Sequence, residues 1–202
     1  MFEDLLALAD WRRAVAELYA DVRKAADPEA AWNHWRTARD ELFRSHPQSP
    51  IPADQRGSFQ GVPYYAYDPV ARVTGGVRPI GLQRYEIPTS GEGTISFTRF
   101  ARVDFELGGR SGSLELYWLE GYGGGLFLPF RDDTSGASTY GAGRYLLDSV
   151  KGADLGMEGD ELVLDFNFSY NPSCSYDPQW LCPLAPPPNR LQLAIEAGER
   201  TR

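Results

Sequence analysis

The chain has 202 residues, of which 28 are acidic and 20 basic, and its net charge is −8 at pH 7. This length is sufficient for one sizeable hydrophobic core and predicts a single domain spanning residues 1–202. The negative charge opposes binding to phosphate backbones and anionic membranes, so neither nucleic acid nor a membrane surface is an expected partner.

Two amphipathic helices are predicted in residues 1–46. Between positions 5 and 22, apolar residues recur every three or four positions, with charged residues between them. Asp27 followed by Pro28 is typical of a helix N-cap and first helical position, and the second helix is predicted to end near Ser45. The short break between the two periodic stretches indicates a helical hairpin.

The start of the chain and its hydropathy predict a cytoplasmic protein. Glu3 and Asp4 stand where a secretory signal carries Lys or Arg. No uninterrupted apolar run approaches the ~20 residues that a membrane-spanning helix needs.

The rest of the chain carries the signals of β-structure. Residues 47–62 contain three prolines and two glycines and are predicted to connect the helices to a β-rich body. In that body, short aromatic and β-branched runs are divided by Gly, Pro and Asp, which predicts eight to ten strands. In the clearest hairpin, residues 103–107 and 114–118 alternate between apolar and polar on either side of Gly108-Gly109. Other strands are predicted at residues 144–149, 161–169 and 191–197.

These elements predict an α+β fold. The N-terminal helical hairpin is expected to pack on a mainly antiparallel β-barrel or strongly bent β-sandwich formed by residues 63–202. Within this body, residues 171–190 include three consecutive prolines, which favour extended geometry, and they are predicted to cross the surface as a strap.

Polar residues are concentrated between Pro129 and Arg190, among glycines and prolines. An irregular segment with many hydrogen-bonding side chains requires a rigid scaffold, and binding sites frequently lie on loops held in this way. Guanidinium groups bind carboxylate or phosphate in a forked geometry, which favours a small polar or anionic ligand. The candidate ligand-binding residues are Arg131, Tyr140, Arg144, Asp165, Asn167, Asn171 and Arg190.

Asp132 and Asp165 are the candidate catalytic bases. A carboxylate works as a base only where its surroundings move its pKa into a useful range. For each aspartate a structural role competes with this interpretation, namely hydrogen bonding to its own turn or pairing with an arginine such as Arg144. Along residues 162–169 one face of the predicted strand is apolar, and the other, with Asp165 and Asn167, faces either water or a ligand-lined interior.

The two cysteines, Cys174 and Cys182, both lie in the Pro-rich strap. Their number and spacing do not supply a zinc site, and His34 and His46 are far upstream, so no metal and no cofactor are predicted. The two thiols either lie close together or form a disulfide that pins the strap, or they are buried free thiols that act as small apolar side chains.

The sequence resembles one family over most of its length, from Trp35 to Glu199. The motifs that carry the resemblance are FRDDTSGASTYGAGRYL and DFNFSYNPSCSYDPQWLCPLAPPPNRLQLAIEAGE, with RDELFRSHPQSPIP and FQGVPYYAYDP upstream. They are similar to the family known as domain of unknown function 1684, whose members are uncharacterised bacterial and archaeal proteins. The resemblance implies no substrate, cofactor or catalytic residue, but it supports the interpretation that positions 130–190 are important to the protein.

The sequence leaves three hypotheses open. In the first, a small polar or anionic molecule binds in a pocket at one end of the barrel. In the second, the chain is an enzyme of hydrolase or isomerase type that uses an Asp base with Arg partners. In the third, the polar cluster is purely structural, and every polar group in it has a protein partner. Nothing in the sequence indicates the oligomeric state.

Overall fold

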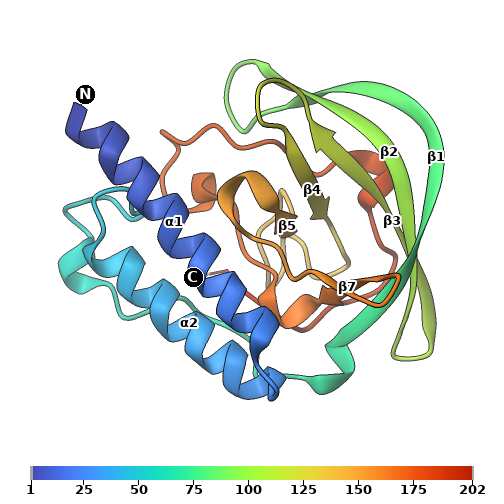
Figure 1. Cartoon of the computed structure of the whole chain (residues 1–202). Coiled ribbons are helices and arrows are strands. Elements are labelled where there is room, and N and C mark those ends of the chain that lie inside the picture. The colour runs from blue at the N-terminus through green and yellow to red at the C-terminus, as the bar shows by residue number, and fades with distance from the viewer. Residues whose placement is uncertain (1, 202) are drawn as a thin grey trace.

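The computed structural model describes residues 2–201, and its first two elements, α1 (Phe2–Lys24) and α2 (Pro28–Ser45), form the predicted helical hairpin. Asp27 is the N-cap of α2, because its carboxylate accepts hydrogen bonds from the backbone N–H groups of Glu29 at 3.0 Å and Ala30 at 3.1 Å. Figure 1 shows the two helices side by side, covering one side of the β-rich body. Within residues 2–201, no helix combines the length and hydrophobicity needed to cross a membrane.

Among residues 2–201, seven strands form one antiparallel sheet in the order β5-β4-β3-β2-β1-β7-β6, fewer than the eight to ten strands predicted. The predicted hairpin around Gly108-Gly109 is confirmed, since Leu107 pairs with Arg110 and both glycines have positive φ. The strands are β1 (Arg72–Pro88), β2 (Thr94–Leu107), β3 (Arg110–Leu119), β4 (Gly125–Phe130), β5 (Arg144–Asp148), β6 (Met157–Glu158) and β7 (Glu161–Asp165).

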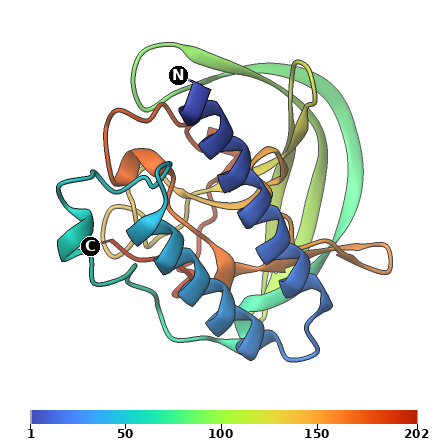
Figure 2. The ribbon, with the colours of Figure 1, turned by 60° about the vertical axis from the view of Figure 1, so that its left-hand side comes forward.

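The sheet is strongly bent but open, so the predicted barrel or two-sheet sandwich does not form within the described part of the chain. Figures 1 and 2 show β1 and β2 curving round the body, and β1 has a register shift between Pro79 and Gln83, where a bulge increases the bend. The edge strand β5 is covered, because the backbones of Tyr145 and Tyr170 exchange hydrogen bonds of 2.8 and 3.0 Å. An irregular segment therefore supplies hydrogen-bond partners to the edge strand β5, as a neighbouring strand would in a closed barrel.

Residues 191–197 do not form the predicted strand, although their alternation is real. Leu191 and Ile195 are buried and the even-numbered residues of the stretch are exposed, as in an extended chain with one face in the core. The backbone bonds to loops and side chains instead of to a neighbouring strand. For example, the Ile195 N–H donates to the Asp132 carboxylate at 2.7 Å. Residues 191–200 are called the C-terminal segment below.

The predicted strand at 161–169 is shorter than expected and is buried on both faces. β7 ends at Asp165, and a short 3₁₀ turn (Phe166–Phe168) follows, in which the Asp165 carboxylate accepts the backbone N–H of Asn167. The face expected to meet water or a ligand is covered by α2, since the Trp32 indole N–H donates to the Asn167 carbonyl at 2.9 Å. The helical hairpin thus covers polar side chains that were expected to face either water or a ligand-lined interior.

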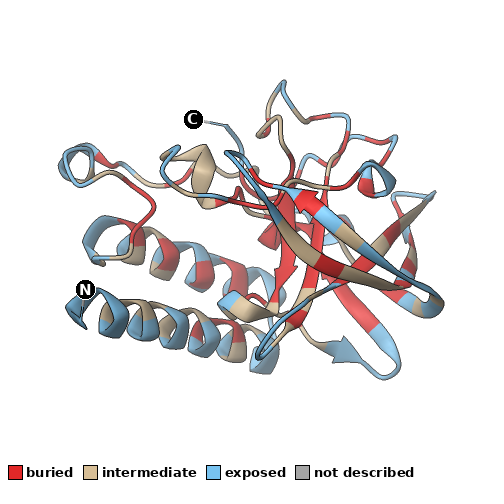
Figure 3. Ribbon diagram, turned by 90° about the horizontal axis from the view of Figure 1, so that it is seen from above, coloured by how far each residue is buried: buried red, intermediate tan, exposed pale blue. Residues whose placement is uncertain are grey.

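Figure 3 shows buried residues concentrated where the helices meet the sheet. The main core joins Trp32 and Trp35 of α2 to apolar residues of β2, β3, β7 and the C-terminal segment. The rings of Trp35 and Phe168 meet edge-to-face with centroids 5.1 Å apart. At Gly152, with φ +84°, a Cβ would lie 2.8 Å from the backbone nitrogen of Ala16, so only glycine lets α1 approach the body this closely. The hairpin is therefore part of the core.

Candidate functional site

Arg144 and Asp132 form an ion pair inside the protein, with 3.3 Å between Nη2 and Oδ2. The residues are only 1% and 3% exposed. Arg144 also donates to the carbonyls of Ile195 at 3.0 Å and of Ala197, while Asp132 accepts the hydroxyl of Thr134 at 2.8 Å. Burial lowers the pKa of Arg144, and Asp132 counteracts this effect. These contacts attach the C-terminal segment to Arg144, whose buried Nε has no hydrogen-bond partner within residues 2–201.

Asn167 is fully buried, and its side-chain amide is bonded at both ends. Its nitrogen donates to the Asp68 carbonyl at 2.8 Å, and its oxygen accepts the Asp68 N–H at 2.9 Å, so the amide substitutes for a neighbouring peptide group. The Asn167 nitrogen also donates to Asp165 Oδ1 at 2.9 Å. Both ends of the Asn167 amide are therefore occupied by groups of the protein itself.

Asp165 is the predicted base whose environment is strongly perturbed. Its Oδ2 lies 3.9 Å from the Nε of Arg72, and burial raises the pKa of the carboxyl to about 6, against the opposing effects of Asn167 and Arg72. Asp165 and Arg72 line a cleft of about 140 Å³ between the facing ends of α1 and α2 and the β6–β7 hairpin. Arg72 is in turn paired with Glu158 of β6. Of the two aspartates, only Asp165 therefore retains the features of a base.

Within residues 2–201, the three predicted arginines line none of the main hollows. Arg131 and Arg190 are adjacent, joined by an isolated bridge between their backbones, but Arg190 is exposed, Arg131 is partly buried and Arg144 lies in the core. Asp132 joins Arg144, whereas Asp165 and Asn167 belong to a different cluster. The predicted ligand-binding residues therefore divide into separate groups instead of converging on one hollow.

A further group occupies the strap. Cys174 and Cys182 are free thiols, and the Cys174 backbone N–H donates to Cys182 Sγ at 3.4 Å. The Tyr140 hydroxyl lies 3.8 Å from Cys174 Sγ. Asn171 precedes this group, and its backbone N–H donates to the Glu199 carboxylate at 3.0 Å. Among residues 2–201, no three metal-ligating side chains of the His, Cys, Asp and Glu types gather in one place.

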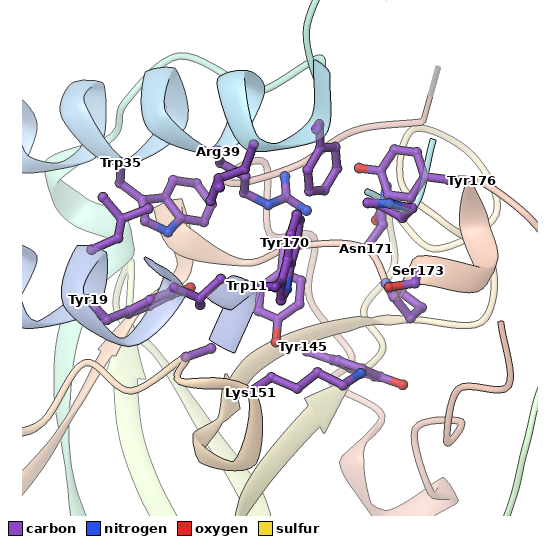
Figure 4. A pocket seen from close by; sticks show the side chains of 17 residues that line it. Trp11, Tyr19, Trp35, Arg39, Tyr145, Lys151, Tyr170, Asn171, Ser173 and Tyr176 are labelled. Atoms are coloured by element: carbon purple, nitrogen blue, oxygen red, sulfur yellow. The ribbon is translucent and has the colours of Figure 1, made fainter. Parts of the chain in front are cut away.

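A hollow with a mainly apolar wall lies where the helical hairpin meets the body, and we call it the hairpin pocket (Figure 4). Its volume is about 80 Å³. α1 and α2 form one wall, and the segment from Tyr170 to Ser173 faces them. Lys151 and Pro50 also border it. Its aromatic residues are Trp11, Tyr19, Trp35, Phe43, Tyr145, Tyr170 and Tyr176.

A second buried ion pair stands at the wall of the hairpin pocket. Arg39 of α2 contacts Glu199 of the C-terminal segment, with 2.9 Å between Nη2 and Oε2, and donates to the Tyr64 hydroxyl at 2.5 Å. Glu199 also accepts the Tyr176 hydroxyl. The Arg39 guanidinium lies over the Phe43 ring, 4.4 Å from its centroid, and Figure 4 shows it pointing toward Tyr170. This pair ties the hairpin to the same segment that Arg144 holds.

Comparison with known proteins places the chain in a family. Residues 57–200, more than half of the chain, match the family model described as protein of unknown function (DUF1684). The chain belongs to this family. A solved relative, an uncharacterised protein of Haloarcula marismortui, is 37% identical with a TM-score of 0.62, and the match covers 86% of this chain and 94% of that one. The search of curated proteins gave no match. Membership in DUF1684 assigns no activity.

The part of this DUF1684 protein that sequence reasoning missed is the hairpin pocket. Of the predicted residues, only Asn171 lines it. The signal was present in α2, where Arg39 occupies the apolar stripe between Trp35 and Leu42 at helical spacing. A charged residue in such a stripe requires a buried partner. Its partner, Glu199, is 160 residues away, and no local pattern connects the two.

The raised pKa of Asp165 predicts a specific pH dependence of stability. In the unfolded chain the carboxyl ionises near its ordinary value of 3.8, whereas in the folded protein it ionises near 6. The folded state therefore binds more protons than the unfolded state in this window, and the contribution of Asp165 to stability falls as the pH rises from 4 through 6. Asp165→Asn is expected to gain up to about 3 kcal/mol relative to wild type between pH 4 and pH 7.

Urea denaturation of both proteins at several pH values measures this difference. The amide oxygen of the variant retains the two hydrogen bonds from Asn167. The part of the stability difference that changes with pH therefore reports the ionisation of Asp165. Asp133→Asn removes an exposed carboxylate and is the control for loss of charge. A difference between Asp165→Asn and wild type that is constant across this pH range would contradict the burial of an ionisable carboxyl.

Proposed function

We propose that this DUF1684 protein binds a compact small molecule in the hairpin pocket, with an apolar body and a hydrogen-bond donor. The observation that carries the proposal is the combination of an aromatic wall with a buried oxygen, Asn171 Oδ1, that lacks a partner within residues 2–201. Small-molecule sites are usually apolar with a few fixed polar groups, and because this pocket is far smaller than most of them, its ligand must be very small or extend into solvent. The second wall of the pocket is the Asn171–Ser173 stretch, so the site includes part of the strap.

Two buried oxygens at the pocket wall support this ligand chemistry. Asn171 Oδ1 has no hydrogen-bond partner within residues 2–201, and the Tyr19 hydroxyl is hydrogen-bonded only to Trp35. Both oxygens are buried, so a ligand meets them only after a small rotation of these two lining side chains. A buried oxygen without a partner costs stability. Asn171 Oδ1 can only accept, which favours a ligand that donates an O–H or N–H group.

The charges around the pocket favour a neutral ligand over the anion suggested by the sequence. Arg39 is neutralised by Glu199, and the Lys151 ammonium lies 3.7 Å from the Asp148 carboxylate. The guanidinium groups on which the anionic ligand was predicted, those of Arg131, Arg144 and Arg190, do not line this pocket. An anion entering it would thus lose its hydration without gaining an unpaired cation.

Benzyl alcohol and benzoate are probes that test both parts of this proposal. They share a ring and differ in carrying either a neutral donor or a negative charge. Benzyl alcohol at millimolar concentration is expected to shift the indole N–H signals of Trp11 and Trp35 in NMR spectra and to raise the melting temperature, and benzoate is expected to bind more weakly. If neither probe moves these signals, the hairpin pocket is not a ligand site.

Tyr19→Phe supplies a variant matched to this pocket. It removes only the hydroxyl, so the empty protein is expected to lose no more than the hydrogen bond with Trp35, about 1 kcal/mol. Loss of one hydrogen bond is expected to weaken benzyl alcohol binding roughly three- to tenfold. Tyr122→Phe, at a fully exposed tyrosine, is the control. If Tyr19→Phe binds benzyl alcohol with unchanged affinity, the Tyr19 hydroxyl does not contact the ligand.

A second candidate function, an enzyme with an Asp base, is supported at Asp165 alone. The carboxyl borders a cleft, has a pKa raised to about 6 by burial, and is near the Arg72 guanidinium. The Asp132 carboxylate is instead occupied by Arg144, Thr134 and the Ile195 N–H and lines none of the main hollows of residues 2–201. If Asp165 is the base, activity found in any hydrolase or isomerase screen is expected to disappear in Asp165→Asn and persist in Asp132→Asn, provided the latter folds.

A further inference from the structure

The two thiols of the strap are held beside each other by backbone contacts. The Cys174 N–H donates to Cys182 Sγ at 3.4 Å. Cys182 is fixed against the end of the β1–β2 hairpin, because its N–H donates to Ser90 Oγ at 3.1 Å and its carbonyl accepts the Ser90 N–H at 2.9 Å. Cys174 lies in a short turn (Ser173–Ser175) that follows Pro172. The pairing of the sulfurs is therefore preorganised by the fold.

The two thiols differ in exposure and in proton affinity. Cys182 is 2% exposed, whereas Cys174 is partly exposed. The pKa of Cys174 is lowered to about 6, first by a hydrogen bond from Cys182 and further by the Ser90 and Tyr140 hydroxyls, against the effect of burial. The same hydrogen bond, together with burial, raises the pKa of Cys182. An accessible thiolate beside a buried protonated thiol is the arrangement of an attacking and a resolving cysteine.

We propose that Cys174 and Cys182 form a redox-active site that reduces a hydroperoxide and closes to a disulfide. The Cys174 thiolate attacks the terminal peroxide oxygen, so that an S–O bond forms and the O–O bond breaks. The alkoxide that leaves takes the proton that Cys174 gave to solvent. Cys182 sulfur then attacks the sulfenic acid, the S–S bond forms, and hydroxide leaves with the Cys182 proton as water. Two thiols and one hydroperoxide thus yield one disulfide, one alcohol and one water.

This chemistry goes beyond the proposed ligand binding and does not depend on it. Oxidation of Cys174 removes the main cause of the raised pKa of Cys182, since that thiol no longer donates to a thiolate. Cys182 therefore becomes easier to ionise at the moment when it must attack. An external dithiol such as dithiothreitol returns the pair to its starting state by thiol–disulfide exchange.

Treatment of the reduced protein with one equivalent of hydrogen peroxide tests the proposal. Mass spectrometry is expected to show loss of two hydrogen atoms, and peptide mapping is expected to show a Cys174–Cys182 bridge that dithiothreitol opens in the folded protein. In Cys182→Ala, dimedone is expected to label a sulfenic acid at Cys174. In Cys174→Ala, the buried Cys182 is expected to remain unlabelled.

The pH dependence of iodoacetamide alkylation separates a redox site from a merely structural pair. In wild type, Cys174 is expected to react with a midpoint near pH 6. Cys182→Ala is expected to move this midpoint upward by about one unit or more. Tyr140→Phe is expected to move it in the same direction by less, and Tyr122→Phe, an exposed tyrosine, is expected to leave it unchanged.

Three results would overturn the assignment. One is a Cys174 that alkylates only near the ordinary thiol pH in folded wild type. Another is peroxide treatment that oxidises Cys174 without forming the bridge. The third is a disulfide that dithiothreitol reduces only after unfolding, which would make the pair a permanent staple of the strap. Circular dichroism of each variant confirms that the comparison is made between folded proteins.

Discussion

Arg144→Met is expected to destabilise the protein by about 3–5 kcal/mol, because it leaves a buried carboxylate without its counter-ion, although Thr134 and the Ile195 N–H still donate to it. The abandoned group is Asp132, which is 3% exposed. The carbonyls of Ile195 and Ala197 also lose the donors that hold the C-terminal segment in the core. Methionine approximates the length of the arginine stem, so loss of packing contributes little. Urea denaturation measures the free energy of unfolding.

Two further variants identify the cause of this loss. Arg190→Met removes an exposed arginine from the same region and is expected to cost less than about 1 kcal/mol. In the Arg144→Met/Asp132→Asn double variant, removal of both charges is expected to recover part of the stability. Hydrogen exchange at residues 193–197 is expected to accelerate in Arg144→Met. If stability and exchange both remain at wild-type levels, the guanidinium does not clamp the segment.

Arg39→Met is the second substitution with a large expected effect, again about 3–5 kcal/mol. Arg39 and Glu199 are 8% and 1% exposed, and their ion pair joins α2 to the C-terminal segment. Without the guanidinium, Glu199 retains the Tyr176 hydroxyl and the Asn171 N–H, so the carboxylate is partly stabilised. The loss is therefore expected near the lower end of the range. Thermal and urea unfolding of the variant provide the measurement.

The α2 helix contains its own control for this experiment. Arg44 pairs with Glu41 at 2.8 Å, but both side chains are substantially exposed, so Arg44→Met is expected to cost less than about 1 kcal/mol. A double-mutant cycle of Arg39→Met and Glu199→Gln measures the coupling between the buried partners, which is expected to be about 1–3 kcal/mol. Equal losses for Arg39→Met and Arg44→Met would show that burial of the pair has no energetic consequence.

The local elements of this fold could be predicted from the sequence because each carries its own signal. The Asp27-Pro28 start of α2 and the Gly108-Gly109 turn have the residues that their backbone geometry requires. The alternation in residues 191–197 correctly indicated an extended segment with one buried face. It gave no information about hydrogen-bond partners, and the partners proved to be side chains and loops instead of a strand.

The candidate site was harder to predict because its polar residues are paired across long distances in the chain. Asn167 bonds to Asp68, and Asn189 bonds to the backbone of Glu115 and Pro129. The polar residues between Pro129 and Arg190 therefore marked a network of hydrogen bonds within the body of the protein. The hairpin pocket lies elsewhere, where the two helices pack against that body. A charged residue in the apolar stripe of a helix, such as Arg39, does predict from the sequence alone that a buried partner exists, but it does not identify that partner.

The position of the C-terminal segment has a consequence for biosynthesis. A nascent chain that has emerged only through residue 190 already contains both helices and all seven strands of the described sheet, yet it lacks the carbonyls and the carboxylate that Arg144 and Arg39 bind. Two guanidinium groups would then have to stay hydrated and keep the interior accessible to water. The body can therefore close only once this segment is available to bind both guanidinium groups, which favours its docking as a late step of folding.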